Sequence, residues 1–356
     1  MDVLSAKLAA ASPRFRATLA SLENLGTPPQ PDGIIFPQLY SFFLHSWTPI
    51  VFAIVYFFTT KYLSANSDGK NRITGKRWKV AIVMHNLFLA VYSAWTFVSA
   101  APLIFSAFAR SYVADGLTGL THTFCDSSLA FWSNNTFSRV AYLFYLSKFY
   151  EVVDTAIILA KGKRVGMLQS YHHAGAVISM GYAFRSMSMP AWIFVVFNSA
   201  IHSIMYLYYV ASACRLPFPM ILKKNLTRLQ ITQFLVGGSL AASYLFIALP
   251  NTRPAHLQEA LAPLFCDMTN ASGSSTLNVT SLEFAAREQL VQARVGGSCL
   301  VTPNQRLAVW INVLYLIPLT YLFVSFFIDS YRKSAAGQGK KSLKPSSGEA
   351  KSVKAE

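Results

Sequence analysis

The chain has 356 residues, of which 53% are hydrophobic and only 13% are charged. Soluble domains carry about 25% charged residues, so this composition excludes an ordinary soluble domain and favours an integral membrane protein. The formal net charge of +16 would suit a nucleic-acid partner, but the basic residues gather in a few loops between apolar stretches, and we expect no nucleic acid.

Apolar stretches of about the length that crosses a bilayer as a helix, roughly 20 residues, recur along the chain. We therefore predict an all-α fold: a polytopic membrane protein with about seven transmembrane helices. The predicted spans are 36–58, 80–108, 137–160, 166–184, 190–211, 229–250 and 308–328. They divide the chain into a lumenal N-terminal segment at 1–34, a membrane domain at 35–330 and a disordered basic tail at 331–356.

The basic residues set the predicted orientation. Six lie at 61–79, three at 161–164, four at 215–228 and seven after the last span. With seven spans these segments share one side of the membrane, which the positive-inside rule makes cytosolic. The C-terminus is then cytosolic, and the N-terminus and the 251–307 loop are lumenal. The basic loops are primarily topogenic, and attraction of an anionic substrate is a compatible second role.

Three of the four cysteines fall on the predicted lumenal side, where a disulfide is permitted. Cys266 and Cys299 share the 251–307 loop, so we predict that they pair, with Cys125 as the competitor for either. Cys214 lies at a cytosolic helix end.

The third predicted span ends in a polar run. Lys148, Glu151 and Thr155 are spaced i, i+3 and i+7 on a helix, with Asp154 beside them. Ionisable groups at this depth must face the bundle interior and find partners. Such a network could simply lock helices together, or it could serve a reaction.

The next two spans add histidines. Gln169, His172 and His173 are spaced i, i+3 and i+4 near the start of the fourth span and project from one face. Asn198 and His202 are spaced i and i+4 in the fifth. A lone buried histidine is commonly a satisfied core residue, whereas adjacent histidines with a polar neighbour one turn away favour function.

Further polar residues continue these stripes. Tyr206 follows His202 on the fifth span, and Gln230 and Gln233 lie at the start of the sixth. These glutamines could equally hold helices together through hydrogen bonds. Four helices that place carboxylates, histidines and amides in the cytosolic half of the bilayer predict a polar chamber open to the cytosol. Such a chamber is costly in a membrane unless it has a function.

Four segments make the chain resemble the ELO family of very-long-chain fatty acid elongases, most closely its fungal members. The motifs are KFYEVVDT at 148–155, QSYHHAGA at 169–176, NSAIHSIMYLYY at 198–209 and LTRLQITQF at 226–234. His85, Asn86 and Ser93 look like a further, weaker element. The family commonly has HxxHH in the histidine box, and here Gln169 stands in place of the first histidine.

The resemblance implies a condensing enzyme, a 3-ketoacyl-CoA synthase. It would join a long-chain acyl-CoA to malonyl-CoA, releasing carbon dioxide and CoA and adding two carbons as a 3-oxoacyl-CoA. The resemblance implies an acyl tunnel in the bundle and no cofactor or metal beyond the two CoA substrates. It also implies the endoplasmic reticulum membrane and, as partners, a ketoreductase, a dehydratase and an enoyl reductase. A homo-oligomer is left open.

No cysteine lies in the predicted chamber, so an imidazole is the available nucleophile. We expect His172 to carry the acyl group and His202 to act as its partner or base. We expect the carbonyl and enolate oxygens to accept hydrogen bonds from His173, Asn198, Gln230 and Gln233. Glu151 and Asp154 would orient the histidines, and Lys148 would balance their charge or bind a substrate anion. Gln169 and Tyr206 are expected to be further substrate-binding residues.

Two alternatives remain open at this level. One is a histidine-ligated membrane metalloenzyme of lipid metabolism. A zinc hydrolase could use His172, His173 and His202, whereas a di-iron hydroxylase would need about eight histidines in several boxes, and the chain has seven. The other alternative is a seven-helix receptor or transporter that catalyses no reaction.

Overall fold

The computed structural model describes residues 11–67, 72–251 and 286–342, and helices make up most of this part of the chain. The β-structure of the described residues consists of an isolated bridge between Ala248 and Ser298. The named elements are α2 (Pro13–Glu23), η1 (Pro37–Leu39), α3 (Tyr40–Leu44), α4 (Trp47–Ala65), α5 (Lys76–Phe124), α6 (Asn135–Tyr150), α7 (Val153–Ala160), α8 (Met167–Arg185), α9 (Ala191–Cys214), α10 (Met220–Ser243) and α13 (Pro303–Ser342).

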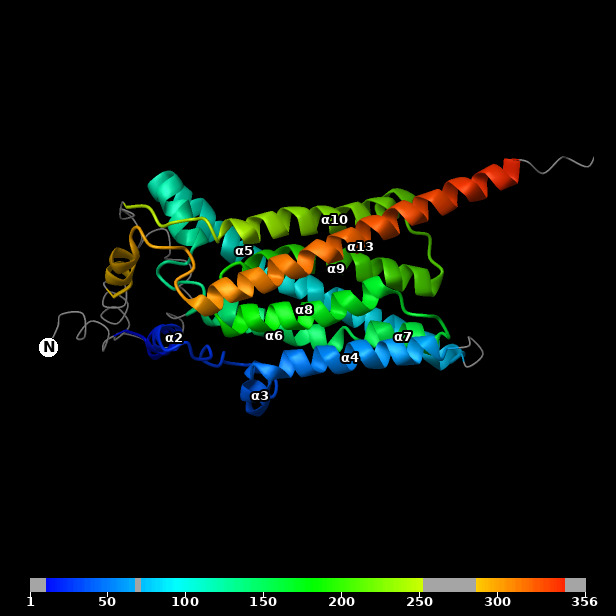
Figure 1. Ribbon diagram of the computed structural model, residues 1–356, viewed down its shortest axis with the longest axis horizontal. Helices are drawn as coiled ribbons and strands as arrows, with labels where there is room; N and C mark the ends of the chain where they lie inside the picture. The colour runs from blue at the N-terminus through cyan, green and yellow to red at the C-terminus, as the bar shows by residue number, and fades with distance from the viewer. Residues whose placement is uncertain (1–10, 68–71, 252–285, 343–356) are drawn as a thin grey trace, which may run out of the picture.

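The long helices form one elongated bundle (Figure 1). In it α5 packs along α9, α4 along α8, and α13 against both α8 and α10. Among the described residues, four helices are long and apolar enough to cross a membrane: α4, α5, α9 and the 303–329 part of α13. The prediction of an all-α membrane protein is confirmed. The count of seven spans stays a prediction, because α6 is short and α8 and α10 carry the polar residues of the chamber.

The third predicted span, 137–160, is not one continuous helix. It breaks between α6 and α7, where the Asp154 amide donates to the Glu151 carbonyl and the Thr155 amide to that of Val152. Bonds of this i to i+3 type tighten the turn, and short tight turns inside a helix often mark functional positions. Glu151 therefore ends one helix and Asp154 begins the next, so the two carboxylates have different surroundings.

The second span extends beyond its predicted end at 108 and then reverses direction. Gly116 has φ +58° and ψ −135°, a backbone conformation that glycine adopts readily and other residues do not. The hydroxyl of Thr123 donates to that of Ser111 at 2.7 Å, a contact that a straight helix would not allow. The last part of α5 is thus folded back at one end of the bundle.

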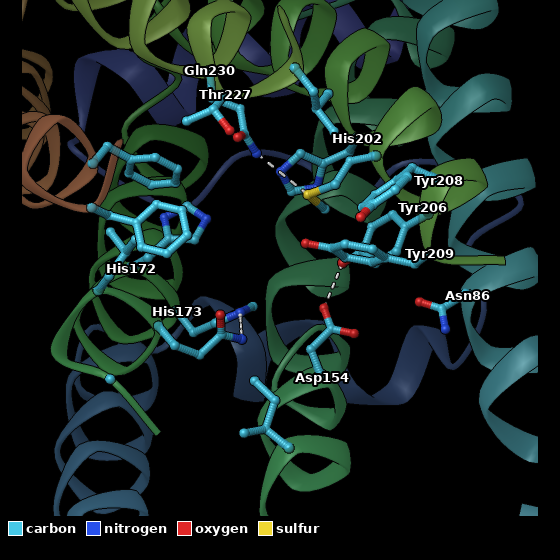
Figure 2. Close-up of a pocket in the computed structure, with 18 of the residues that line it drawn as sticks. Asn86, Asp154, His172, His173, His202, Tyr206, Tyr208, Tyr209, Thr227 and Gln230 are labelled. Carbon is cyan, nitrogen blue, oxygen red and sulfur yellow. Dashed lines mark hydrogen bonds between the residues drawn. The ribbon is translucent and has the colours of Figure 1, made fainter. Parts of the chain in front are cut away.

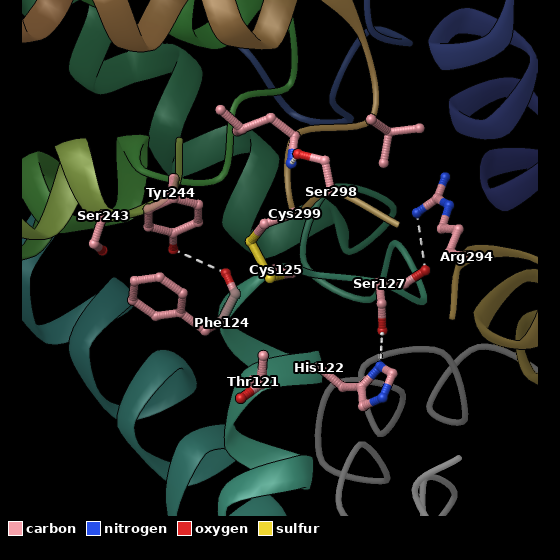
Figure 3. The surroundings of a disulfide bond; sticks show 12 residues. Thr121, His122, Phe124, Cys125, Ser127, Ser243, Tyr244, Arg294, Ser298 and Cys299 are labelled. Atoms are coloured by element: carbon pink, nitrogen blue, oxygen red, sulfur yellow. Dashed lines mark hydrogen bonds between the residues drawn. A yellow bond between two sulfur atoms is a disulfide. The ribbon is translucent and has the colours of Figure 1, made fainter. Parts of the chain in front are cut away.

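At this end a disulfide joins Cys125 to Cys299 (Figure 3). The predicted pairing of Cys266 with Cys299 is wrong, because the reversal of α5 brings Cys125 beside the segment that precedes α13; Cys266 lies outside the described residues. Next to the disulfide, the Asp126 carboxylate accepts hydrogen bonds from two backbone amides. Burial raises the pKa of this carboxyl group, and it lowers the pKa of Arg294 nearby to about 10.

Helix α13 continues past the predicted boundary at 330 and ends at Ser342, so residues 331–342 of the predicted tail are helical. The rest of the predicted tail, 343–356, lies outside the described residues. The domain boundaries at 34 and 330 stay predictions.

Candidate active site

A cavity of about 1130 Å³ lies inside the bundle, walled by residues of α5, α7, α8, α9, α10 and α13. Its lining includes Lys161 and Gly166 from the turn between α7 and α8, which places one side of the cavity at the end of the bundle where the basic loops gather (Figure 1). The predicted site residues that line it are Asp154, Gln169, His172, His173, Asn198, His202, Tyr206, Gln230 and Gln233. The predicted chamber therefore exists as a single cavity.

His172 lies on α8 at the cavity wall (Figure 2). Its Nδ1 is 2.8 Å from the hydroxyl of Tyr315, on α13, and this hydroxyl also donates to the backbone carbonyl of His172 at 3.0 Å. Rings of Phe234 and Phe323 pack about the imidazole. Tyr315 was missed by the sequence analysis, because a tyrosine in an apolar span reads as an ordinary interface residue.

His173 is held by the neighbouring turn of the same helix. Its Nε2 lies 2.8 Å from the amide nitrogen of Gln169, which also donates to the hydroxyl of Thr155 at 3.3 Å. Because an amide nitrogen can only donate, Nε2 of His173 is an acceptor here and the proton of the neutral ring is on Nδ1. Tyr56 of α4 closes this network through its 2.7 Å contact with the hydroxyl of Thr155.

Asp154 binds two side chains from other helices. One oxygen lies 2.8 Å from Nε2 of His85, and the other accepts a 2.7 Å hydrogen bond from Tyr206. The second ring nitrogen of His85 lies 3.1 Å from the hydroxyl of Tyr150. Asp154 was expected to orient the chamber histidines, but it hydrogen-bonds to His85 and Tyr206 rather than to His172 or His202. His85, a weak signal in the sequence, is the histidine that this carboxylate orients.

Lys148 and Glu151 lie behind the cavity wall and do not line it. Each is only 4% exposed, and the ammonium group of Lys148 is 2.6 Å from the carboxylate of Glu151. Lys148 also donates to the amide oxygen of Asn198 at 3.2 Å, and Ser147 donates to Glu151 at 3.0 Å. This pair therefore acts on the cavity through Asn198, whose side chain it orients.

His202 differs from the other two histidines of the chamber. It is buried, it lines the cavity and its ring stands edge-on to Tyr206 (Figure 2). No other side chain in the described part of the chain hydrogen-bonds to its ring nitrogens. The amide of Gln230 donates to the sulfur of Met205 at 3.5 Å and has no other hydrogen-bond partner among the described residues. His202 and Gln230 thus keep polar capacity available for a bound molecule.

Within the described ranges, no three His, Cys, Asp or Glu side chains are grouped so that they could hold a metal ion. Two of the imidazole nitrogens that a three-histidine zinc site would draw on, Nδ1 of His172 and Nε2 of His173, are already bonded to Tyr315 and Gln169.

The fold and this cavity define a multi-pass membrane protein whose polar side chains converge inside the bundle. The chain belongs to the ELO (GNS1/SUR4) family, whose profile matches residues 41–339. It is 30% identical over 203 residues to "Fatty acid elongase sre1" of Dictyostelium discoideum, covering 56% of this chain and 69% of that protein. It is 26% identical over 268 residues to "Fatty acid elongase 2" of Trypanosoma brucei brucei, covering 74% and 79%. The resemblance found in the sequence motifs is confirmed.

Proposed function

We propose that this chain, a fatty acid elongation enzyme of the ELO family, is a very-long-chain 3-oxoacyl-CoA synthase. It condenses a long-chain acyl-CoA with malonyl-CoA and gives carbon dioxide, CoA and a 3-oxoacyl-CoA longer by two carbons. The family and the names of its relatives support the elongation function. The observation that supports the condensation is that His172 and His202 line one cavity together with the amide side chains of Asn198, Gln230 and Gln233.

His172 is the nucleophile in this proposal. A neutral imidazole attacks a thioester readily, and the resulting acyl-imidazole is about as reactive as the thioester, so that acyl transfer in either direction is feasible. Ser170, two residues before His172 on α8, is fully buried and bonds to the carbonyl of Gly166, which leaves it no access to substrate. The described residues that line the cavity include no cysteine.

The enolate that forms when malonyl-CoA loses carbon dioxide needs donors to its oxygen. Gln230, Gln233 and Asn198 supply amide N–H groups from two helices that face the cavity, and His202 supplies a ring nitrogen. Preorganised donors in a site that excludes water contribute strongly to stabilising such a charge. Tyr206, whose proton is donated to Asp154, presents an acceptor oxygen rather than a donor. Lys161 at the rim is placed to meet CoA phosphates.

The proposed function also implies a membrane location for this protein and other enzymes that act with it. The α4–α5, α7–α8 and α9–α10 connections, which contain the basic loops, lie at one end of the bundle (Figure 1), and the amide of Ile73 donates to the carbonyl of Ala160 between two of them at 2.9 Å. This end is cytosolic in the endoplasmic reticulum membrane, with the C-terminus on the same side. No cofactor is needed beyond the two CoA substrates. A ketoreductase, a dehydratase and an enoyl reductase complete the cycle.

The test uses purified full-length protein, labelled malonyl-CoA and a panel of acyl-CoA primers. Label should appear in 3-oxoacyl-CoA, and acyl-CoA alone should release about one equivalent of CoA in a burst while adding the acyl mass to the peptide that contains His172. His172→Ala should abolish both, and His45→Ala, at an exposed histidine outside the cavity, should change neither. Condensation without a CoA burst would replace the acyl-enzyme by a direct reaction in a ternary complex. No condensation with any primer would refute the synthase.

A further inference from the structure

Helix α13 contributes a tyrosine to the environment of His172, and this tyrosine makes two contacts to one residue. The hydroxyl oxygen of Tyr315 lies 2.8 Å from Nδ1 of His172 and 3.0 Å from the backbone carbonyl oxygen of the same residue. Tyr315 does not line the cavity, whereas His172 does. Tyr315 therefore contacts the imidazole from behind, at the nitrogen next to the backbone.

The two contacts together determine where the protons lie. A carbonyl oxygen can only accept, and a tyrosine hydroxyl has a single proton to donate. If that proton is donated to the carbonyl of His172, the hydroxyl oxygen must accept from Nδ1–H for the second contact to be a hydrogen bond. The arrangement that makes both contacts hydrogen bonds thus has the neutral His172 protonated on Nδ1. Its Nε2 then has a free lone pair.

A close approach of α13 to α8 makes this geometry feasible. A Cβ atom added at Gly175 would clash with Cε2 and Cδ2 of Tyr315, so the tyrosine ring rests directly on the backbone at this glycine. Two further bonds tie the helices together. Tyr171 donates to the backbone carbonyl of Tyr315 at 3.3 Å, and Asn312 donates to Ser179 at 2.7 Å.

We propose that Tyr315, seated on Gly175, is a positioning residue that holds His172 in the Nδ1–H tautomer and so assigns Nε2 as the atom that accepts the acyl group. This proposal rests on the proposed function. Positioning partners that fix a tautomer are essential where an imidazole must present one particular nitrogen, as in the serine protease triad.

The proton assignment gives a balanced cycle in which His172 never exchanges its proton. The Nε2 lone pair attacks the thioester carbonyl carbon, the C–S bond breaks, and CoA leaves as a thiolate. The product is an acyl-imidazolium that keeps its proton on Nδ1, directed at the Tyr315 oxygen. Malonyl-CoA then loses carbon dioxide, its enolate carbon attacks the acyl carbon, and the electron pair of the breaking C–N bond returns to Nε2. The positive acyl-imidazolium is a better acyl donor than a neutral acyl-imidazole.

The decisive variant is Tyr315→Phe, which keeps the ring against Gly175 and removes only the hydroxyl. With acyl-CoA alone, CoA release should slow by about 10- to 100-fold, by analogy with the loss of a partner that orients a metal-bound histidine. KM for acyl-CoA should stay unchanged, since Tyr315 does not line the cavity. Tyr171→Phe is the matched control, because it removes a hydroxyl from the same helix contact without touching the imidazole. It should release CoA at the wild-type rate.

Nitrogen NMR of histidine-labelled protein reads the tautomer directly, with the His172 signal assigned by its absence in His172→Ala. We expect Nδ1 of His172 to be protonated in the wild type and the Nε2–H form to appear in Tyr315→Phe. Gly175→Ala provides a second route, because its Cβ must push the intact tyrosine away. It should produce the same tautomer shift, and adding Tyr315→Phe should slow CoA release no further.

Three results would overturn the assignment: Nε2 protonated in wild-type His172, full-rate CoA release by Tyr315→Phe, or an equal slowing by Tyr171→Phe, which would indicate a general effect on helix packing. If the wild type releases no CoA without malonyl-CoA, the acyl-enzyme of the proposed function fails. In that case the nitrogen NMR signals of His172 alone decide whether Tyr315 holds the imidazole in the Nδ1–H tautomer.

Discussion

The amide nitrogen of Gln169 lies 2.8 Å from Nε2 of His173, one turn away on α8, at the position where the family commonly has a histidine. An imidazole can donate one N–H to the same acceptor, whereas the Gln169 amide donates to both His173 and Thr155. We therefore expect Gln169→His to keep measurable turnover with an altered preference among acyl-CoA primers.

Gln169→Leu is the comparison, because it fills the space and donates nothing. It should lower turnover by about tenfold, the lower end of what loss of an orienting partner costs. Both variants are assayed with labelled malonyl-CoA. If the Gln169→His variant folds but has no activity, Gln169 contacts a reacting group directly.

The buried Lys148–Glu151 pair is expected to control stability in a non-additive way. Removing one member leaves an uncompensated charge, at a cost of about 3–5 kcal/mol, whereas replacing both by neutral residues is often close to neutral. Lys148→Met and Glu151→Gln should each lower the thermal unfolding midpoint in detergent, and the double variant should be more stable than either. Lys163→Met, at an exposed position, is the control. If the double variant loses as much stability as the two single variants together, each charge is stabilised by other groups and not by its partner.

The Cys125–Cys299 disulfide closes a separation of 174 residues and joins the end of α5 to the segment before α13. Removing such a bridge typically costs about 2–5 kcal/mol. Mass spectrometry of a non-reduced digest should find these two cysteines linked, and Cys125→Ser should lower the unfolding midpoint. Cys214→Ser, at an exposed free thiol, should not. A peptide linking Cys266 to Cys299 would contradict the structure.

The orientation is tested in sealed microsomes. We expect an added protease to cut the 161–166 turn and to remove a C-terminal epitope, while the 251–307 loop is protected until detergent is added. The physical reason is the clustering of basic loops at one end of the bundle. Digestion of the 251–307 loop in intact vesicles would reverse the orientation.

Much of the site could be predicted because it is local. Gln169, His172 and His173 share a face of α8 through the helical repeat alone, and Asn198 and His202 do the same on α9. The break between α6 and α7 could not be predicted in this way, since no proline or glycine marks it in the sequence. It separates Glu151, buried with Lys148, from Asp154, which reaches the cavity.

By itself the sequence determined the class of protein, since composition and apolar stretch length do not depend on how helices meet. It also determined which polar residues share a helix face, because a helix repeats every 3.6 residues whatever surrounds it. Only the tertiary structure decided which side chains contact one another across helices. Tyr315 is 143 residues from His172, His85 is 69 from Asp154, and Cys125 is 174 from Cys299. Contacts over such separations depend on which helix faces are packed together, and the periodicity of a single helix does not specify its neighbour.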